Sequence, residues 1–517
     1  MKRAAVIIGL LSASTASGFS APPKLDTVWP PGAKLGSAVE ITLEGKFDPW
    51  PCEVNFSKPG FNFVPDPEKS GAGKLDISAE VSPGPVLVRA INEDGASAPV
   101  IFVVDDRTEI EEKEEDKNTL AGAQEIDLQA LPLVINGRLS GTNELDAFRL
   151  ALKKGEAVHA AVEGYTLRSL VDPALHLYDE EGNRLVLEHD SEVHLDPRLS
   201  FTAPANGNYV LSLAGFAHPP ATAVSYRGSK TTRYRLHLAR EQKELPARLL
   251  PADIGPDSKD PTLAAGKPKI GTLSKPGEIG RHSIKAKKGQ QFLVSVEAAS
   301  LGFPTDAVLR VLKPDGSELR TVDDANKQRD PEYLWKVAAD GDYEIAVTDR
   351  FGRGGPNLRY RVGLAEPEPA FSATVDKSEY VLERGKPLEI KVKIGRLRGH
   401  KADLGFAIPD LPESIQITTP DEVPEKGGEV TLKLEAKEKA EPFSQSVAIR
   451  VTEKAAGDSA ADDSAAGKKV DAVFSFQDGD SRGPYAIDET SDIWLTLPPE
   501  EKAEEKAADP EKSKEKS

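Results

Sequence analysis

The sequence contains one cysteine, Cys52, in 517 residues. No disulfide can therefore form within one chain, and metal sites built from several cysteines are excluded. We expect Cys52 to be a small buried apolar residue. Without disulfides, stability must come from hydrophobic cores, which domains of about 100 residues can supply.

Long apolar runs and excess basic charge are also missing. The N-terminal run over residues 4–11 is too short to span a bilayer, which takes about 20 apolar residues. Preceded by Lys2 and Arg3 and followed by small residues, it predicts a signal peptide over residues 1–21. We therefore expect a protein without a membrane span that is secreted, periplasmic or on the cell surface. The formal charge of −18 argues against nucleic acid as a partner, because nucleic-acid-binding surfaces are basic.

Aromatic residues are scarce as well, at 6% of the chain. Carbohydrate binding needs exposed aromatic rings, and the only candidates left open by their pattern are Trp29, Trp50, Phe61 and Phe63. Core or proline-stacking roles are the preferred interpretation for them. The zinc-protease pair H-E-x-x-H and the glycine-rich phosphate loops are absent. We therefore expect no catalytic residues, no cofactor-binding residues and no metal ligands, and so a protein that is not an enzyme.

What the sequence does contain is short strands between turn residues. Val39, Ile41 and Leu43 alternate with polar residues, and residues 388–394 do the same. A helical period is nearly absent. This pattern predicts an all-β chain of tandem β-sandwiches, immunoglobulin-like or jelly-roll-like.

One stretch of the chain occurs twice. Residues 137–213 align without a gap to residues 271–347, 134 positions later, and 20 of the 77 pairs are identical. A register held over that length predicts a duplicated domain, each copy with its own core. The identities include Gly137 with Gly271, Lys153-Lys-Gly155 with Lys287-Lys-Gly289, Asp172 with Asp306, Gly182 with Gly316, Asp190 with Asp324, Asp196-Pro197 with Asp330-Pro331, and Tyr209 with Tyr343.

The predicted organisation is an extended array of sandwiches with flexible linkers and a disordered C-terminal tail. Its parts are a signal peptide (1–21), a first sandwich (22–104), an acidic linker (105–118), the first repeat (119–241), a proline-rich linker (242–267), the second repeat (268–366), an immunoglobulin-like sandwich (371–498) with a low-complexity loop (455–468), and a charged tail (499–517).

The repeat resembles a known family. The segments around Phe148, Lys153-Lys-Gly155, Asp172-Pro173, Asp196-Pro197 and Gly207-Asn-Tyr209, with a closing Tyr-Arg-Leu, are similar to the bacterial pre-peptidase C-terminal (PPC) domain. That resemblance implies a β-sandwich often associated with secreted peptidases. In the second copy Gly280 and His282 replace Asp146 and Phe148, so we expect a variant edge strand there within the same fold.

The first sandwich resembles the immunoglobulin-like IPT/TIG domain. The resemblance is carried by Pro31-Gly32, Gly36, Gly45, the run from Val86 to Asn92, and Gly95.

The repeated aspartates are the best chemical candidates. Side chains of this kind could gather at one end of each sandwich and hold Ca²⁺ through carboxylate oxygens. The preferred alternative is structural, because Asp before Pro or before a strand commonly fixes a turn by accepting backbone N–H bonds. The residues concerned are Asp172, Asp190 and Asp196, with Asp306, Asp324 and Asp330. Metal ligation by His189 with His194 is a further hypothesis, whereas His176 and His237 are predicted to be exposed.

The two copies differ most in their last loop. Residues 215–232 are eight longer than the matching residues 349–358. Binding residues of β-sandwiches often lie on such loops, although a tolerated insertion is the preferred interpretation. The loop carries Phe216, His218, Pro219, Pro220, Tyr226 and Arg227.

Three functional hypotheses remain. The leading one is a non-catalytic exported protein that mediates extracellular or cell-surface interactions, as an adhesin, scaffold or binding module. The second is an accessory or targeting subunit of a secreted peptidase or other hydrolase. The third is a glycan-binding protein that uses Trp29 or Trp50. An extracellular protein, a polysaccharide or a secreted hydrolase are thus the expected partners.

Overall fold

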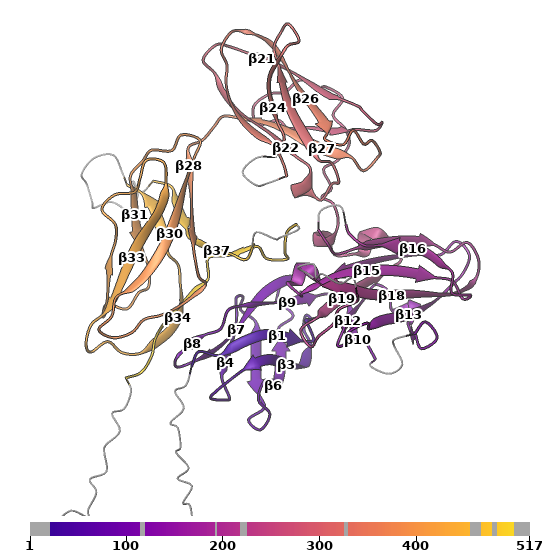
Figure 1. Cartoon of the computed structure of the whole chain (residues 1–517), viewed down its shortest axis with the longest axis vertical. Coiled ribbons are helices and arrows are strands. Elements are labelled where there is room, and N and C mark those ends of the chain that lie inside the picture. The colour runs from indigo at the N-terminus through magenta and orange to yellow at the C-terminus, as the bar shows by residue number, and fades with distance from the viewer. Residues whose placement is uncertain are drawn as a thin grey trace, which may run out of the picture.

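The computed structural model describes residues 21–113, 119–191, 194–217, 225–324, 329–454, 467–477 and 483–500. Over these residues the predicted all-β fold is confirmed, with strands assembled into four successive β-sandwiches (Figure 1). We call them domains 1 to 4 in chain order. Nearly all of the predicted signal peptide, low-complexity loop and charged tail lies outside the described residues.

Domain 1 packs the sheet β1-β3-β6-β5 against the sheet β2-β9-β7-β4, with β8 paired to β7. The predicted alternation is seen in β3, where Ile41 and Leu43 are buried between polar neighbours that are not. Cys52 is buried in the same core, as expected. The strands are β1 (Lys24–Trp29), β2 (Gly32–Lys34), β3 (Ala38–Lys46), β4 (Glu53–Phe56), β5 (Phe61–Pro65), β6 (Ala72–Ile77), β7 (Gly84–Asn92), β8 (Gly95–Ala96) and β9 (Val100–Asp105).

Domain 2 packs the sheet β10-β12-β19-β14-β17 against the sheet β11-β13-β18-β15-β16. Its elements are β10 (Thr108–Glu111), β11 (Gln124–Glu125), η1 (Leu128–Ala130), β12 (Leu133–Arg138), β13 (Leu145–Leu152), β14 (Ala157–Glu163), η2 (Tyr165–Leu167), β15 (Val171–Tyr178), β16 (Arg184–Glu188), β17 (Arg198–Thr202), β18 (Gly207–Ala217) and β19 (Arg233–Ala239).

Domain 3 repeats this topology. Its sheets β20-β27-β22-β25 and β21-β26-β23-β24 have the same strand order as the matching strands of domain 2, without counterparts of β10 and β11. The duplication read from the sequence is therefore a duplication of fold. Its elements are β20 (Lys269–Thr272), β21 (Gly280–Ala286), β22 (Gln291–Glu297), η5 (Ala299–Leu301), β23 (Ala307–Leu312), β24 (Glu318–Val322), β25 (Glu332–Lys336), β26 (Gly341–Asp349) and β27 (Arg359–Ala365).

The repeated residues have structural work in both copies. Tyr209 donates its hydroxyl hydrogen bond to the Ala205 carbonyl at 3.0 Å, and Tyr343 does the same to Ala339 at 2.8 Å. This is the tyrosine corner of β-sandwiches, which ties a strand start to the turn before it.

The repeated glycine at the start of each copy is required by close packing. A Cβ on Gly137 would overlap the ring of Tyr234, and one on Gly271 would overlap the ring of Tyr360. Only glycine allows the backbone to pass so close to the buried tyrosine.

The expected variant edge in the second copy keeps its pairing. Strand β21 pairs with β26 along its whole length. Tyr234 donates to Asp146 at 2.7 Å, whereas Tyr360 lies 2.9 Å from Nε2 of His282. In domain 3 Gly280 stands at the position of Asp146, so the carboxylate partner of the tyrosine is missing. His282, which stands at the position of Phe148, is the polar partner of Tyr360 instead.

Domain 4 is also a β-sandwich, with the sheet β32-β33-β30-β28-β37-β38 facing the sheets β29-β39-β34 and β31-β35-β36 across one core. Its strands are β28 (Ala370–Val375), β29 (Glu379–Val381), β30 (Leu388–Leu397), β31 (Leu404–Ala407), β32 (Ile415–Thr418), β33 (Gly428–Ala436), β34 (Phe443–Val447), β35 (Arg450–Glu453), β36 (Lys469–Asp471), β37 (Val473–Ser475), β38 (Glu489–Thr490) and β39 (Ile493–Leu497).

The described parts of the two predicted linkers pack on the domains, although flexible connections were expected; residues 114–118 of the acidic linker lie outside the described residues. In the acidic one, Thr108–Glu111 forms β10 and pairs in parallel with β12. In the proline-rich one, the turns η3 (Gln242–Glu244) and η4 (Ala247–Leu249) place Leu245 and Leu249 against domain 2. Composition suggested solvated segments, but each carries apolar residues or charges that find partners in domain 2.

The domains are in tandem order, but they are not strung out as an open array. Domain 4 returns to domain 1, and its strand β37 points toward β9 and domain 2, while domain 3 stands apart (Figure 1). Trp494 of domain 4 packs with Ile91 and Ala96 of domain 1. The closure depends on contacts between residues hundreds of positions apart.

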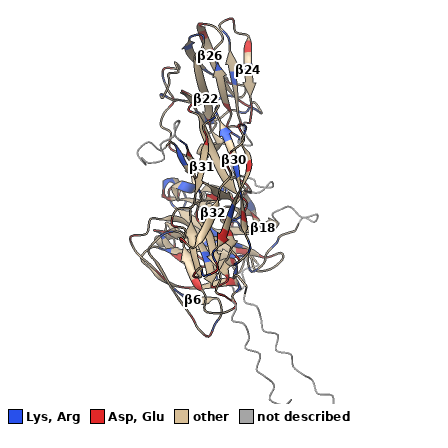
Figure 2. Ribbon diagram, turned by 90° about the vertical axis from the view of Figure 1, so that its left-hand side faces the viewer, with Lys and Arg blue, Asp and Glu red and all other residues tan. Residues whose placement is uncertain are grey.

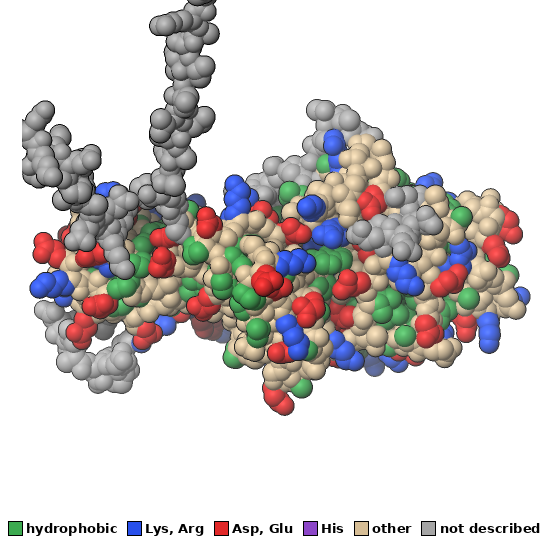
Figure 3. Space-filling view, turned by 90° about the horizontal axis from the view of Figure 1, so that it is seen from below, with side chains coloured by type: hydrophobic (Ala, Val, Ile, Leu, Met, Phe, Trp, Pro, Cys, Tyr) green, Lys and Arg blue, Asp and Glu red, His purple; other side chains and the backbone are tan. Residues whose placement is uncertain are grey.

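Acidic and basic residues are interspersed along the ribbon (Figure 2). The face seen in Figure 3 carries both signs of charge with small hydrophobic areas between them. Among the described residues, no helix is long and apolar enough to cross a membrane.

Candidate functional site

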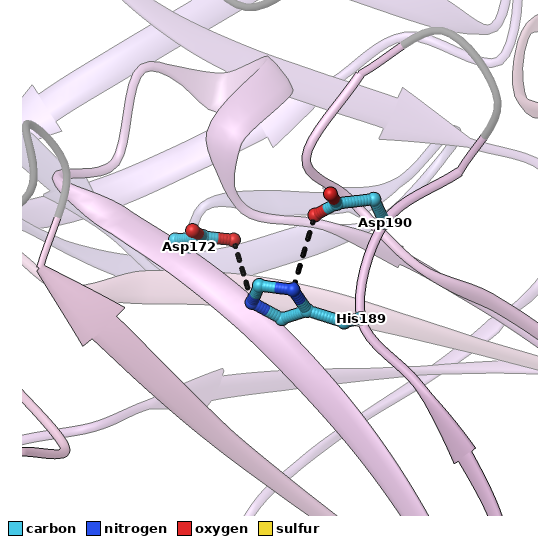
Figure 4. Close-up of side chains that lie close together, drawn as sticks. All are labelled: Asp172, His189 and Asp190. Carbon is cyan, nitrogen blue, oxygen red and sulfur yellow. Dashed lines mark ion pairs between the residues drawn. The ribbon is translucent and has the colours of Figure 1, made fainter. Parts of the chain in front are cut away.

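The structure brings three of the chemically interesting residues of domain 2 together. Asp172 lies near the start of β15, and His189 and Asp190 follow the end of β16 (Figure 4). Strands β15 and β16 are antiparallel neighbours, so the start of one and the end of the other meet at one edge of the sheet.

The imidazole of His189 lies between the two carboxylates. Its Nε2 is 3.3 Å from Oδ1 of Asp172, and its Nδ1 is 3.5 Å from Oδ1 of Asp190 (Figure 4). The side chain of Asp172 is 17% exposed and that of Asp190 50%, so the cluster opens to solvent on the Asp190 side.

Phe216, near the end of β18, packs against this cluster, and Tyr226 of the long loop packs against Phe216. Phe216 is the register partner of Asp172 across β18 and β15, and its ring meets His189 edge-on at 5.5 Å. Tyr226 lies 5.3 Å from Phe216 and forms an isolated β-bridge with it. The candidate contact loop and the repeated aspartates, which were separate predictions, thus form one site. His218, Pro219 and Pro220 lie outside the described residues, and Arg227 is exposed.

The matching positions of domain 3 form a different cluster. Asp306, Asp323 and Asp324 replace Asp172, His189 and Asp190. Arg350 stands where domain 2 has Phe216, and its guanidinium forms an ion pair with Asp323. Burial and the neighbouring Asp324 raise the pKa of Asp306, while Arg350 opposes that shift. Domain 3 thus brings its own cation to the place where domain 2 presents aromatic rings.

Asp196 and Asp330 do not join these clusters, so the calcium hypothesis does not extend to them. Asp196 accepts hydrogen bonds from the backbone N–H groups of Gly164, Tyr165 and Thr166, at 3.0, 2.7 and 2.8 Å. Asp330 accepts the same three bonds in domain 3 from residues 298–300. Asp196 and Asp330 thus have the structural role that was the preferred alternative to calcium binding. Asp196 fixes the 3-10 turn after β14, and Asp330 fixes the one after β22.

The remaining donors restrict what metal the domain 2 cluster could take. An imidazole beside two carboxylates suits a borderline metal such as Zn²⁺ better than Ca²⁺, which prefers oxygen alone. However, each ring nitrogen of His189 faces a different carboxylate, so one ion could bind all three side chains only after that ring turned. His194 is not part of this cluster among the described residues, and its Nδ1 accepts from the Asp196 backbone N–H at 3.1 Å. The cluster therefore gives no support to the hypothesis that His189 and His194 share a metal.

The tryptophans of domain 1 are used within the structure. The guanidinium of Arg138 in domain 2 stacks 4.7 Å from the Trp29 ring, which places that ring at the domain interface. Trp50 donates its indole N–H to the Asp66 carbonyl at 2.7 Å, and Phe61 stacks on the core residue Phe56 at 4.4 Å. Phe63 is half-buried against the same core. The structural interpretation of these rings is favoured over a glycan platform.

Sequence reasoning missed a buried ionic network between domains 1 and 2. Arg235 is fully buried and lies 2.9 Å from Glu109, 3.6 Å from Glu163 and 3.7 Å from Asp105 of domain 1. Arg248, from the proline-rich linker, binds Glu163 at 2.8 Å and Asp105 at 3.4 Å. The network therefore fastens domain 1, domain 2 and the following linker together.

His237 belongs to the same network, so its predicted exposure is wrong. It is fully buried, and its Nε2 lies 2.8 Å from Glu163. Burial lowers the pKa of His237, although the bond to Glu163 opposes this. Burial alone would raise the pKa of Glu163, but Arg248 and His237 hold it well below its usual range. His176, also predicted to be exposed, is buried on the outer face of its sheet.

Two further arginines cross domain boundaries. Arg233 donates to the carbonyls of Ile101 in domain 1 and Leu167 in domain 2, at 3.1 and 3.4 Å. Burial and the nearby Arg168 lower its pKa to about 10. Arg89 of domain 1 is 1% exposed. The alternating pattern of a strand cannot identify such residues. It predicts that an arginine on the outer face of a sheet is exposed to solvent, whether or not another domain covers that face.

Gly32 supplied the only local signal for this interface. A Cβ there would overlap the guanidinium of Arg235. The glycine of the Pro31-Gly32 pair, which was named above for the IPT/TIG resemblance, thus allows a close approach by the neighbouring domain.

Comparisons with known proteins give likenesses of fold. No protein-family model and no curated protein sequence matches the chain. Among solved structures, the PPC domain of a collagenase from Bacillus anthracis matches with 12% identity and a TM-score of 0.17, covering 21% of this chain and 97% of that one. The S-layer protein SbsC matches at 11% identity and a TM-score of 0.15, covering 92% of this chain and 40% of that one. The four N-terminal Ig domains of Dscam1 match at 12% identity and a TM-score of 0.17, with coverage of 88% and 98%. These values carry no statement about binding, and the two family resemblances remain resemblances.

Proposed function

We propose that this is a non-catalytic exported protein that binds an extracellular or cell-surface partner through domain 2, on a framework held by domains 1 and 4. The binding surface is the site formed by Asp172, His189, Asp190, Phe216 and Tyr226. The observation that carries this proposal is the difference between the two copies at matched positions.

In domain 3 the matching cluster already holds a cation, because Arg350 forms an ion pair with Asp323, the residue at the position of His189. In domain 2 the residue at that position is Phe216, and Asp190 is half exposed beside it. Carboxylates and aromatic faces both attract cations. The partner chemistry that fits domain 2 is therefore a basic side chain, as a lysine or arginine of a protein segment would offer.

The interfaces around domain 2 support a framework role. The buried network of Arg235, Glu163 and Asp105 fixes domain 2 on domain 1, so the site has a set orientation in the molecule. A binding surface on a rigid support loses less entropy when a partner docks.

Capture from the native extracellular fraction tests the proposal. The full chain is compared with the variants Phe216→Ala/Tyr226→Ala and Asp190→Asn, and with the matched control Asp324→Asn in domain 3. We expect about a tenfold loss of captured partner with the domain 2 variants, equivalent to about 1.4 kcal/mol of binding, and no loss with the control.

Equal capture by wild type and the domain 2 variants would contradict this site. Hydrolysis of peptides or glycans by the purified chain would contradict a non-catalytic role. If the captured partner is a secreted peptidase or other hydrolase, the protein is the accessory subunit of that enzyme, which specifies the same proposal.

A further inference from the structure

Part of domain 4 leaves its own sandwich and docks on domains 1 and 2. We call residues 473–477 and 483–490 of this segment, which include β37 and β38, the clasp. Phe476 of the clasp is 5% exposed, yet it packs in a cluster with domains 1 and 2 and is absent from the core cluster of domain 4. Figure 1 shows β37 directed away from the body of domain 4.

The clasp meets an apolar surface that neither domain uses for its own core. Leu87, Ile101 and Val103 lie on the outer face of β7 and β9, and alternate with residues that fill the core of domain 1. Leu167 of domain 2 completes the surface, which we call the receptor. Apolar sheet faces of this kind mark an interaction site, because exposed apolar area is costly in water.

Specific contacts fix the clasp on the receptor. The guanidinium of Arg168 lies 4.6 Å from the Phe476 ring, and the rings of Tyr165 and Tyr485 are 5.0 Å apart. The backbone N–H of Ala486 donates to the carbonyl of Thr166 at 2.8 Å.

A second contact holds the body of domain 4 on domain 1. Arg89 donates to the carbonyls of Ser378 and Asp492 at 3.2 and 3.0 Å, and lies 3.6 Å from Glu379. With Trp494 packed on Ile91, this contact and the clasp form a continuous interface.

The connection between domains 3 and 4 is slight by comparison. It consists of residues 366–369, Glu-Pro-Glu-Pro, which are mostly exposed and outside any strand. The core clusters of domains 3 and 4 share no residue among those described. Arg398 and Glu332 join the two domains by an ion pair of 3.8 Å, with side chains 25% and 37% exposed. A surface pair of this kind contributes little to stability.

We propose that domain 4 is exchangeable between copies: the clasp of one chain occupies the receptor of a second chain, and reciprocally, giving a dimer. All contacts of the closed interface are non-covalent and would be the same between two chains, so exchange costs movement at residues 366–369 and the exposed Arg398–Glu332 pair. Within one chain the short connection keeps domain 4 at an effective concentration of about 1 mM, so the closed monomer dominates at lower concentration. Reciprocal exchange closes on itself, as in domain-swapped dimers.

Complementation between two full-length variants tests the exchange. The receptor variant carries Leu87→Asp and Arg89→Ala, and the clasp variant carries Phe476→Asp and Tyr485→Ala. Each spoils one side of the interface and spares the core cluster of its own domain. We expect each variant alone to be a monomer with a larger radius of gyration than wild type, by X-ray scattering. The receptor variant keeps an intact clasp, and the clasp variant keeps an intact receptor. Mixed at about 0.1 mM each, which is below the effective concentration within one chain, the two variants should form a 1:1 complex of twice the monomer mass by light scattering.

Two controls keep the result interpretable. Two batches of the receptor variant, mixed with each other, should stay monomeric, and circular dichroism should match wild type for both variants. A mixture that remains monomeric would overturn exchange. Variants whose radius of gyration equals that of wild type would also overturn it, because the interface would then not hold domain 4.

Discussion

The buried tyrosine hydroxyl of each repeat has a polar partner in both copies, although the partner residue differs between them. Tyr360 of domain 3 has lost the carboxylate used by Tyr234, and His282 takes that place at 2.9 Å. Burial raises the pKa of Tyr360, so the hydroxyl is a neutral donor or acceptor at every ordinary pH.

We predict that His282→Phe, which restores the residue type of domain 2, destabilises domain 3 by roughly 1–3 kcal/mol. The reason is that Tyr360 then keeps a buried hydroxyl without its partner. Adding Tyr360→Phe should recover most of the loss, because removing both polar groups together is nearly neutral. Denaturant unfolding followed by Trp335, the tryptophan of domain 3, measures this. Equal stability of the single and double variants would contradict the pairing.

Two glutamates at matching positions of the two copies allow a buried ion pair to be compared with an exposed one. Glu163 and Glu297 occupy matching positions, and each binds an arginine of the closing strand. The Glu163 pair is fully buried under domain 1, whereas the side chains of Glu297 and Arg361 are 38% and 34% exposed.

We expect Glu163→Gln to cost roughly 3–5 kcal/mol, because it removes one of the two buried carboxylates that Arg235 and Arg248 share and leaves part of the buried positive charge unbalanced. Glu297→Gln is the matched control and should cost about 0–1 kcal/mol, since solvent screens an exposed pair. Thermal unfolding of both variants measures the difference. Similar losses in the two variants would show that burial by domain 1 does not govern the pair.

At the scale of elements, segments that read as linkers act as structural pieces. Strand β10 and the turns η3 and η4 bring Glu109 and Arg248 to the buried network. Burial opposes ionisation of Asp105, but His237, Arg107 and Arg235 together lower its pKa to about 2. Glu163 is held low as well.

This network predicts acid lability of the interface between domains 1 and 2. Both carboxyls have folded-state pKa values below their unfolded values of about 3.9 and 4.3. Their contribution is therefore complete above pH ~4.5 and is lost as pH falls toward 2, where protons bind the unfolded state first. The melting temperature of wild type should drop through this window, and Glu163→Gln should flatten the drop. A drop of the same size in that variant would exclude Glu163 as a source.

At the scale of the whole molecule, the closure of domain 4 on domain 1 depends on Arg89. Its guanidinium is the donor for carbonyls on both sides of the interface, from Ser97 of domain 1 and from Ser378 and Asp492 of domain 4.

Arg89→Ala should therefore weaken that interface by roughly 2–5 kcal/mol, because buried acceptors lose a charged donor. The expected result is a larger radius of gyration and faster proteolysis at residues 366–369. Arg450→Ala is the control, since Arg450 pairs with Asp471 on the surface of domain 4 itself. If both variants behave like wild type, Arg89 does not hold the closure.

Local sequence determined the strands, the turns and the duplication. These features depend on residues that are close in sequence or lie within one domain, so their pattern can be read along the chain. Examples are the alternation in β3, the Gly-x-Tyr corners, and the glycines Gly137 and Gly271 that pack on Tyr234 and Tyr360. The structural role of Asp196 and Asp330 can also be predicted from local sequence, because an Asp-Pro pair before a strand commonly fixes a turn.

Only the tertiary structure decided which charged and aromatic residues meet. It joined Asp172, His189 and Phe216 into one site, buried Arg89 and Arg235, and seated Phe476 on another domain. An arginine or phenylalanine on the outer face of a strand has the same local pattern whether water or a distant domain covers it. The covering residues here lie up to about 400 positions away, as with Arg89 and Asp492, and no local rule connects them.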